Sequence, residues 1–176
     1  MPGPRKPPLV LARWEIRPAG GSPTIRGELR APRGPAPSTV VVLHTRAADT
    51  GGRELLRSLA RAIAHHGHAA LSVDEPHVAD EIRSVLDAAT GGRLFPHPPR
   101  RVALLGHAGG APEAIDAAAD PRVDALVTWP VAASGSQGGL VSAAARVTVP
   151  WLVVGEEDGA ADAVLRWLDR QLAGAE

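Results

Sequence analysis

The chain has 176 residues, of which 44% are hydrophobic and 22% charged, a balance typical of one globular domain with a sizeable core. Its 19 Lys and Arg residues equal its 19 Asp and Glu residues, so charge gives no reason to expect a nucleic acid or an anionic membrane as a partner. Cysteine is absent, which excludes disulfides, cysteine nucleophiles and thiolate metal sites.

No targeting or membrane segment is expected in this sequence. The basic, proline-rich residues 1–8 lack the apolar stretch of a signal peptide, and no apolar run approaches the roughly 20 residues of a membrane span. We therefore expect residues 1–8 to be a disordered tail, residues 9–176 to be a single domain, and the protein to be cytoplasmic.

The N-terminal part predicts a pair of antiparallel strands. Residues 9–17 and 24–30 alternate partly between apolar and polar side chains, and a Gly- and Pro-containing loop separates them. Residues 31–38 contain three prolines and predict a surface linker. Residues 39–43, Thr-Val-Val-Val-Leu, form an apolar run typical of a central strand that is covered on both faces.

Helices and strands alternate through the rest of the chain. Further strands are expected at residues 69–73, 102–105, 123–129 and 149–154, and helices at 53–66, 78–89, 140–146 and 160–172. This order predicts an α/β fold, with a doubly wound, mainly parallel sheet and helices on both faces.

A sharp turn follows the strand at residues 102–105. The strand breaks at Gly106, and an Ala-rich helix follows with Pro112 in its first turn, where a missing N–H costs little. A strand, a glycine turn and a helix are the context of the G-x-S-x-G nucleophile elbow. Residues 106–110 read Gly-His-Ala-Gly-Gly, so Ala108 stands where the attacking serine would be.

Four segments in this order resemble the α/β-hydrolase superfamily, especially its small lidless members of the dienelactone-hydrolase type. They are residues 40–44, 67–74, 106–110 and 149–158. The resemblance spans residues 10–173. It implies an α/β-hydrolase-like sheet without a cap and with a shortened C-terminal edge.

The resemblance also implies where a catalytic site would lie. It places the nucleophile on Ala108 and the acid on Asp158, with oxyanion donors from the backbone N–H groups of Gly109 and Thr45. Two departures stand out: Ala108 has no oxygen with which to form an acyl-enzyme, and no histidine follows Asp158, where the family has its base.

Residues at the carboxyl ends of parallel strands are further candidates, because ligands gather there. His44, Asp74 and Trp129 are candidate ligand-binding residues, together with Thr45 and Gly109. Each of these three also has a structural interpretation. His44 could be a hydrogen-bonded histidine at a strand–loop junction, Asp74 could hydrogen-bond loop N–H groups, and Trp129 could pack in the core.

Two histidines are candidate substitutes for the missing base. His77 follows the strand at 69–73, and His107 flanks the elbow. In the resembled family the position of His107 packs beneath the turn. Asp158 would need such a partner, and its alternative role is to cap the helix that begins near residue 160.

Two other polar clusters receive structural interpretations. His65, His66 and His68 sit at a helix end, where cations suit the helix dipole, and they lack a recognisable metal-ligand pattern. Ser134, Ser136 and Gln137 predict a flexible loop in preference to a relocated nucleophile or phosphate nest. No metal and no cofactor are predicted.

The sequence favours a non-hydrolytic member of this fold, a pseudoenzyme that binds a small carbonyl or carboxylate compound or a partner protein. One alternative is an active hydrolase of esters or lactones, with water attacking directly and acid–base help from His44, His77 or His107 and Asp158. Another is a variant inactivated by loss of a serine at position 108. A third hypothesis is an interaction protein that uses its exposed sheet edge, and pairing at that edge predicts a homodimer.

Overall fold

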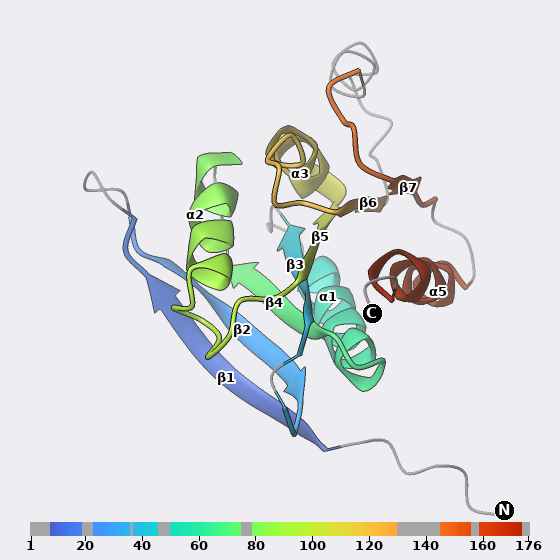
Figure 1. Ribbon diagram of the computed structural model, residues 1–176. Helices are drawn as coiled ribbons and strands as arrows, with labels where there is room; N and C mark the ends of the chain where they lie inside the picture. The colour runs from blue at the N-terminus through green and yellow to red at the C-terminus, as the bar shows by residue number, and fades with distance from the viewer. Residues whose placement is uncertain are drawn as a thin grey trace, which may run out of the picture.

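A computed structural model describes residues 8–18, 23–35, 37–45, 50–74, 79–129, 145–155 and 159–173. Its centre is a seven-stranded sheet with the strand order β1-β2-β4-β3-β5-β6-β7 (Figure 1). The strands are β1 (Leu9–Ile16), β2 (Ile25–Pro32), β3 (Thr39–Thr45), β4 (Ala69–Asp74), β5 (Arg101–His107), β6 (Ala125–Trp129) and β7 (Trp151–Val153).

The sheet has an antiparallel part and a parallel part. β1 pairs with β2 and β2 with β4 in antiparallel fashion, as the alternating pattern of residues 9–30 predicted for the first pair. The strands from β4 through β3, β5, β6 and β7 run parallel. The mainly parallel sheet is therefore confirmed.

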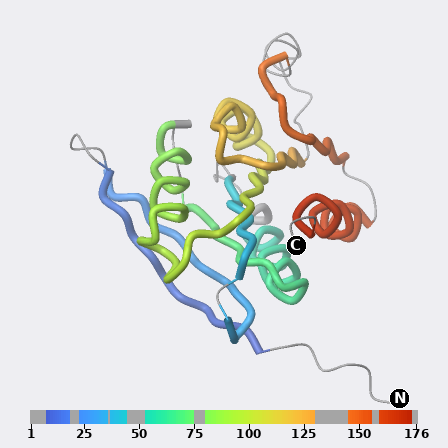
Figure 2. The backbone as a smooth tube through the Cα atoms, viewed as in Figure 1, coloured from blue at the N-terminus to red at the C-terminus, as the bar shows by residue number. Residues whose placement is uncertain are grey.

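Helices cover both faces of the sheet. They are α1 (Thr50–His65), α2 (Ala79–Thr90), the short 3₁₀ turn η2 (Ala108–Gly110), α3 (Ala111–Ala117) and α5 (Ala160–Leu172). Figure 1 shows α2 and α3 on one side of the sheet and α1 and α5 on the other. The tube in Figure 2 shows how the chain returns from β7 to lay α5 beside α1.

The central strands divide their side chains between two apolar layers. Val40 and Val42 pack with α2 and α3, whereas Val41 and Leu43 pack with α1 and α5, and all four side chains are fully buried. Successive residues of a strand point to opposite faces, so an unbroken apolar run suits a strand that is covered on both sides.

The strand after the last α/β crossover is shorter than expected. The sequence predicted a strand at residues 149–154, but β7 contains only Trp151–Val153 and lies at one edge of the sheet. The helix expected at residues 140–146 falls largely outside the described residues. Among the described helices, none is both long and apolar enough to cross a membrane.

Candidate functional site

The turn after β5 contains a residue in the left-handed backbone conformation that is not glycine. Ala108 has φ 48°, and no other described residue except glycine has a positive φ. An L-residue pays roughly 1–2 kcal/mol for the left-handed conformation. The turn is therefore strained, and the methyl group of Ala108, which the resemblance places at the nucleophile position, is partly exposed.

Gly106 lets the helix after the turn lie close against β5. A Cβ added at Gly106 would stand 2.7 Å from the Cβ of Ala114 and 2.8 Å from the Cα of Ala111. Those distances are too short for any side chain, so the glycine is required by the packing of α3 on the strand. Pro112 occupies the first turn of α3, as the sequence predicted.

His107 packs against Trp129 at the ends of two paired strands. The two residues are register partners of β5 and β6, and each is 7% exposed. Their rings lie edge to face, with centroids 6.2 Å apart and planes at 85°. This arrangement is typical of aromatic packing in a core.

His44 is buried at the end of β3, beside the elbow. It pairs in register with Gly106 and is 1% exposed. Its Nε2 atom lies 4.0 Å from Oε2 of Glu113, in the first turn of α3. An acid and a histidine therefore lie 4.0 Å apart beside the elbow, a separation longer than a hydrogen bond.

Glu113 was not among the residues that the sequence singled out. The signal available was its place five residues after Ala108, in the first turn of the elbow helix. A helix that packs back over the neighbouring strand brings that turn near the end of β3. Sequence spacing alone does not show that the side chain faces His44.

The remaining candidates are only partly placed. Gly109 follows Ala108 in η2 and is exposed. The backbone of Thr45 ends β3, but its side chain lies outside the described residues, as do His77 and Asp158. Asp74 ends β4, which lies on the opposite side of β3 from the elbow strand. The elbow thus gathers candidates from β3, β5 and β6 but not Asp74.

The histidine cluster lies near the other end of the sheet. The carboxylate of Asp169 in α5 contacts two histidines. Its Oδ2 atom lies 2.8 Å from Nδ1 of His66, and its Oδ1 atom lies 3.0 Å from Nε2 of His68. The Nδ1 atom of His68 also hydrogen-bonds the hydroxyl of Thr39, at the start of β3. Burial raises the pKa of Asp169, but the hydrogen bonds from both histidines outweigh burial and hold this pKa below its ordinary value.

These hydrogen bonds give His66 and His68 a structural role. They join the α1–β4 turn to the C-terminal helix. Among the described residues no group of three or more His, Cys, Asp or Glu side chains is arranged to hold a metal ion.

Solved structures resemble this chain, whereas the sequence comparisons found no match. No protein-family model and no curated protein matches the sequence. A zinc-bound cold-adapted esterase from an Arctic intertidal metagenomic library is 15% identical with a TM-score of 0.75, over 93% of this chain and 94% of its own.

Two further solved structures are similar. Dienelactone hydrolase from Anabaena variabilis is 16% identical with a TM-score of 0.66, over 93% of this chain and 97% of its own. The esterase domain of a Rhodothermus marinus protein is 13% identical with a TM-score of 0.65, over 93% and 99%. Together with the strand order and the elbow, these likenesses confirm the predicted fold. The chain has an α/β-hydrolase fold of the dienelactone-hydrolase type.

Proposed function

We propose that this protein is a non-hydrolytic member of the α/β-hydrolase fold, which binds a small carbonyl or carboxylate compound at the elbow. The observation that carries the proposal is Ala108 at φ 48°. The turn keeps the costly conformation that would present a nucleophile, and the side chain at that position has no oxygen.

The surroundings of Ala108 support binding more than covalent catalysis. Ala108 is partly exposed and Gly109 is exposed, so a ligand can reach the backbone of the turn. The resemblance assigns oxyanion donors to the N–H groups of Gly109 and Thr45, and such donors suit a carbonyl or carboxylate oxygen. His107 is engaged with Trp129 in the core, which disfavours it as a substitute base.

Hydrolysis of p-nitrophenyl esters and a dienelactone by the chain and by Ala108→Ser tests the absence of catalysis. We expect no turnover by the chain above the buffer rate. Turnover gained by Ala108→Ser would mean that the site still assembles around a usable base. Turnover by the unaltered chain that is lost in His44→Gln would overturn the non-hydrolytic assignment.

Binding is tested with a small carboxylate, benzoate, by isothermal titration. We expect saturable binding that Ala108→Leu abolishes, because a larger side chain at the turn fills the space above Gly109. Ala119→Leu is the matched control, since Ala119 is exposed beyond the end of α3. Equal binding by both variants would move the ligand away from the elbow.

The contact between His44 and Glu113 favours a second candidate function, hydrolysis by direct attack of water. A carboxylate that hydrogen-bonds an imidazole orients it as a general base, and the 4.0 Å between these two groups would have to shorten to about 2.6–3.2 Å when substrate binds. In this scheme His44 takes a proton from water while the water oxygen bonds to the ester carbonyl carbon. The ester C–O bond then breaks, and the proton passes to the departing alcohol.

Glu113→Gln separates this second function from background hydrolysis. If water attack operates, the variant loses most of the turnover of the unaltered chain and its pH–rate profile shifts. Glu54→Gln, at an exposed position on α1, is the control and leaves the rate unchanged. A rate that is the same in all three proteins would exclude the His44–Glu113 mechanism.

A further inference from the structure

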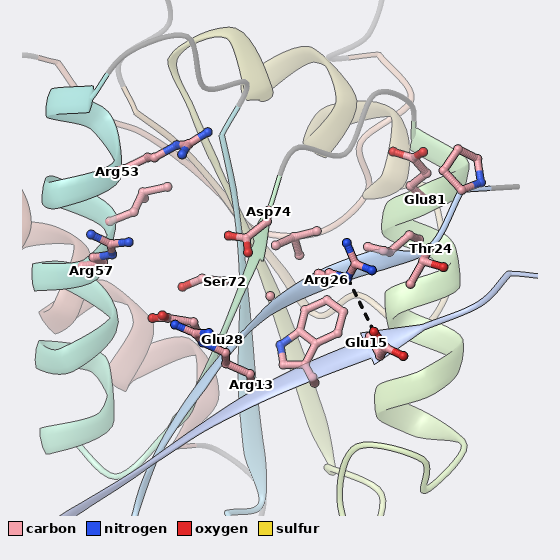
Figure 3. A pocket seen from close by; sticks show the side chains of 16 residues that line it. Arg13, Glu15, Thr24, Arg26, Glu28, Arg53, Arg57, Ser72, Asp74 and Glu81 are labelled. Carbon is pink, nitrogen blue, oxygen red and sulfur yellow. Dashed lines mark hydrogen bonds and ion pairs between the residues drawn. The ribbon is translucent and has the colours of Figure 1, made fainter.

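A cavity lies away from the elbow, over the end of β4. Its volume is about 820 Å³, within the range of roughly 300–1,000 Å³ that small-molecule sites occupy. It is bounded by β1, β2 and β4 and by the N-terminal halves of α1 and α2 (Figure 3). None of the described residues that line it belongs to β5, η2 or α3.

Charged side chains dominate the lining. They are the arginines Arg13, Arg26, Arg53 and Arg57 and the acids Glu15, Glu28, Asp74 and Glu81. Two of the acids are occupied: Oε2 of Glu15 lies 3.5 Å from Nε of Arg26, and Oε2 of Glu28 lies 3.2 Å from Nη2 of Arg30, outside the lining. Because Arg30 neutralises Glu28 from outside the lining, the four arginines of the lining face three other acids.

The positive charge is concentrated on the α1 side. Figure 3 shows Arg53 and Arg57 on α1 at one side of the cavity, Glu81 on α2 at the other, and Asp74 between them. Arg53 and Arg57 are four residues apart and so share one face of the helix. The first turn of α1 contains no acid, and the positive end of the helix dipole lies at this end of α1.

Two of the arginines have their guanidinium groups available. Within the described ranges, Arg13 and Arg57 form no ion pair, and both are exposed. They come from β1 and α1, on two sides of the cavity, and the hydroxyl-bearing Ser72 of β4 lies between these elements. A guanidinium group binds carboxylate or phosphate oxygens through paired N–H donors.

We infer that this cavity is a second ligand site, which takes a small molecule carrying a carboxylate or phosphate group. Arg57 and Arg13 hold the oxyanion, with Arg53 adding positive charge from the same helix face. The shared chemistry is an oxyanion of small size. None of its described lining residues belongs to the elbow.

Isothermal titration with inorganic phosphate and, separately, with succinate tests the inference and distinguishes the two sources of the oxyanion. We expect saturable binding of at least one probe, weakened about tenfold or more by Arg57→Gln, the loss of one charge-assisted contact. Arg61→Gln is the matched control, because Arg61 is exposed one turn further along α1 and does not line the cavity.

Asp74→Asn checks the sign of the ligand charge. Removing a carboxylate from the lining should strengthen the binding of an oxyanion, whereas it would weaken the binding of a cation. The inference is overturned if neither probe binds, if Arg57→Gln and Arg61→Gln weaken binding equally, or if Asp74→Asn abolishes it. Because the elbow is itself proposed to bind a carboxylate, both probes are titrated into Ala108→Leu as well as into the unaltered chain. Binding that Ala108→Leu retains and Arg57→Gln weakens belongs to the cavity, so failure here is distinguishable from failure of the elbow proposal.

Discussion

The Oδ1 atom of Asp169 in α5 lies 3.0 Å from Nε2 of His68, a residue 101 positions earlier in the chain. His68 is 8% exposed and stands directly before β4. The contact therefore fixes the last helix of the fold to the start of a central strand. Few other polar contacts in the described residues join segments so far apart in sequence.

Asp169→Asn should lower the free energy of unfolding by about 1 kcal/mol. The substitution removes the charge that accepts hydrogen bonds from two histidines, and the half-exposed position keeps the loss near the lower end for charged hydrogen bonds. Urea unfolding at neutral pH measures the change.

Asp116→Asn is the control for that variant. Asp116 is 47% exposed and pairs with Arg146, which is 66% exposed, so this ion pair is largely screened by water. We expect it to change the unfolding free energy by less than about 0.5 kcal/mol. Equal losses in the two variants would mean that the Asp169 cluster contributes no more than a surface pair.

The contribution of Asp169 should disappear in acid. The pKa of Asp169 in the folded chain lies below its ordinary value. Its ionised form therefore stabilises the fold above the unfolded pKa, and this stability is lost as pH falls through the folded value. The difference between the chain and Asp169→Asn should therefore shrink from about pH 7 to about pH 2. A difference that stays constant over this interval would show that the carboxylate charge is not its source.

Ala108→Gly should stabilise the chain by about 0.5–1 kcal/mol. Glycine relieves the left-handed strain of roughly 1–2 kcal/mol. It also raises the conformational entropy of the unfolded chain, which offsets part of this gain in stability. Ala118→Gly should act in the opposite direction, because Ala118 has φ −68° and is buried. Thermal unfolding of the two variants gives the signs, and a loss of stability in Ala108→Gly would contradict the strained turn.

Gly106→Ala should destabilise the chain by about 1–3 kcal/mol. The new methyl group would collide with Ala111 and Ala114, and α3 would have to move off β5. Gly109→Ala is the comparison, because Gly109 is exposed and its φ is not positive. Urea unfolding that ranks the two substitutions equally would mean that α3 does not need its close approach to the strand.

Local sequence pattern predicted the elements of this fold well. Residues 40–43 form an apolar run and are fully buried in β3, and the glycines around Ala108 marked the sharp turn. In both places the cause lies within a few residues of the signal. Burial on both faces requires an unbroken apolar run, and a tight turn against a helix requires glycine.

Contacts between distant segments were not predictable in the same way. β2 pairs with β4 and not with β3, which follows it in the chain, and no local pattern specifies that neighbour. The position of Asp169 between His66 and His68 depends on how α5 returns across the sheet. The approach of Glu113 to His44 depends likewise on the packing of α3, which the spacing of the two residues does not encode.

The backbone of Ala108 has a consequence for the history of this fold. Every alanine codon becomes a serine codon by one base change, and the left-handed turn already holds position 108 as an elbow would. A single point mutation would thus place a hydroxyl group on a turn whose residue 108 already has a positive φ. The step between a turn with a methyl group and a turn with a hydroxyl group at position 108 is therefore one base.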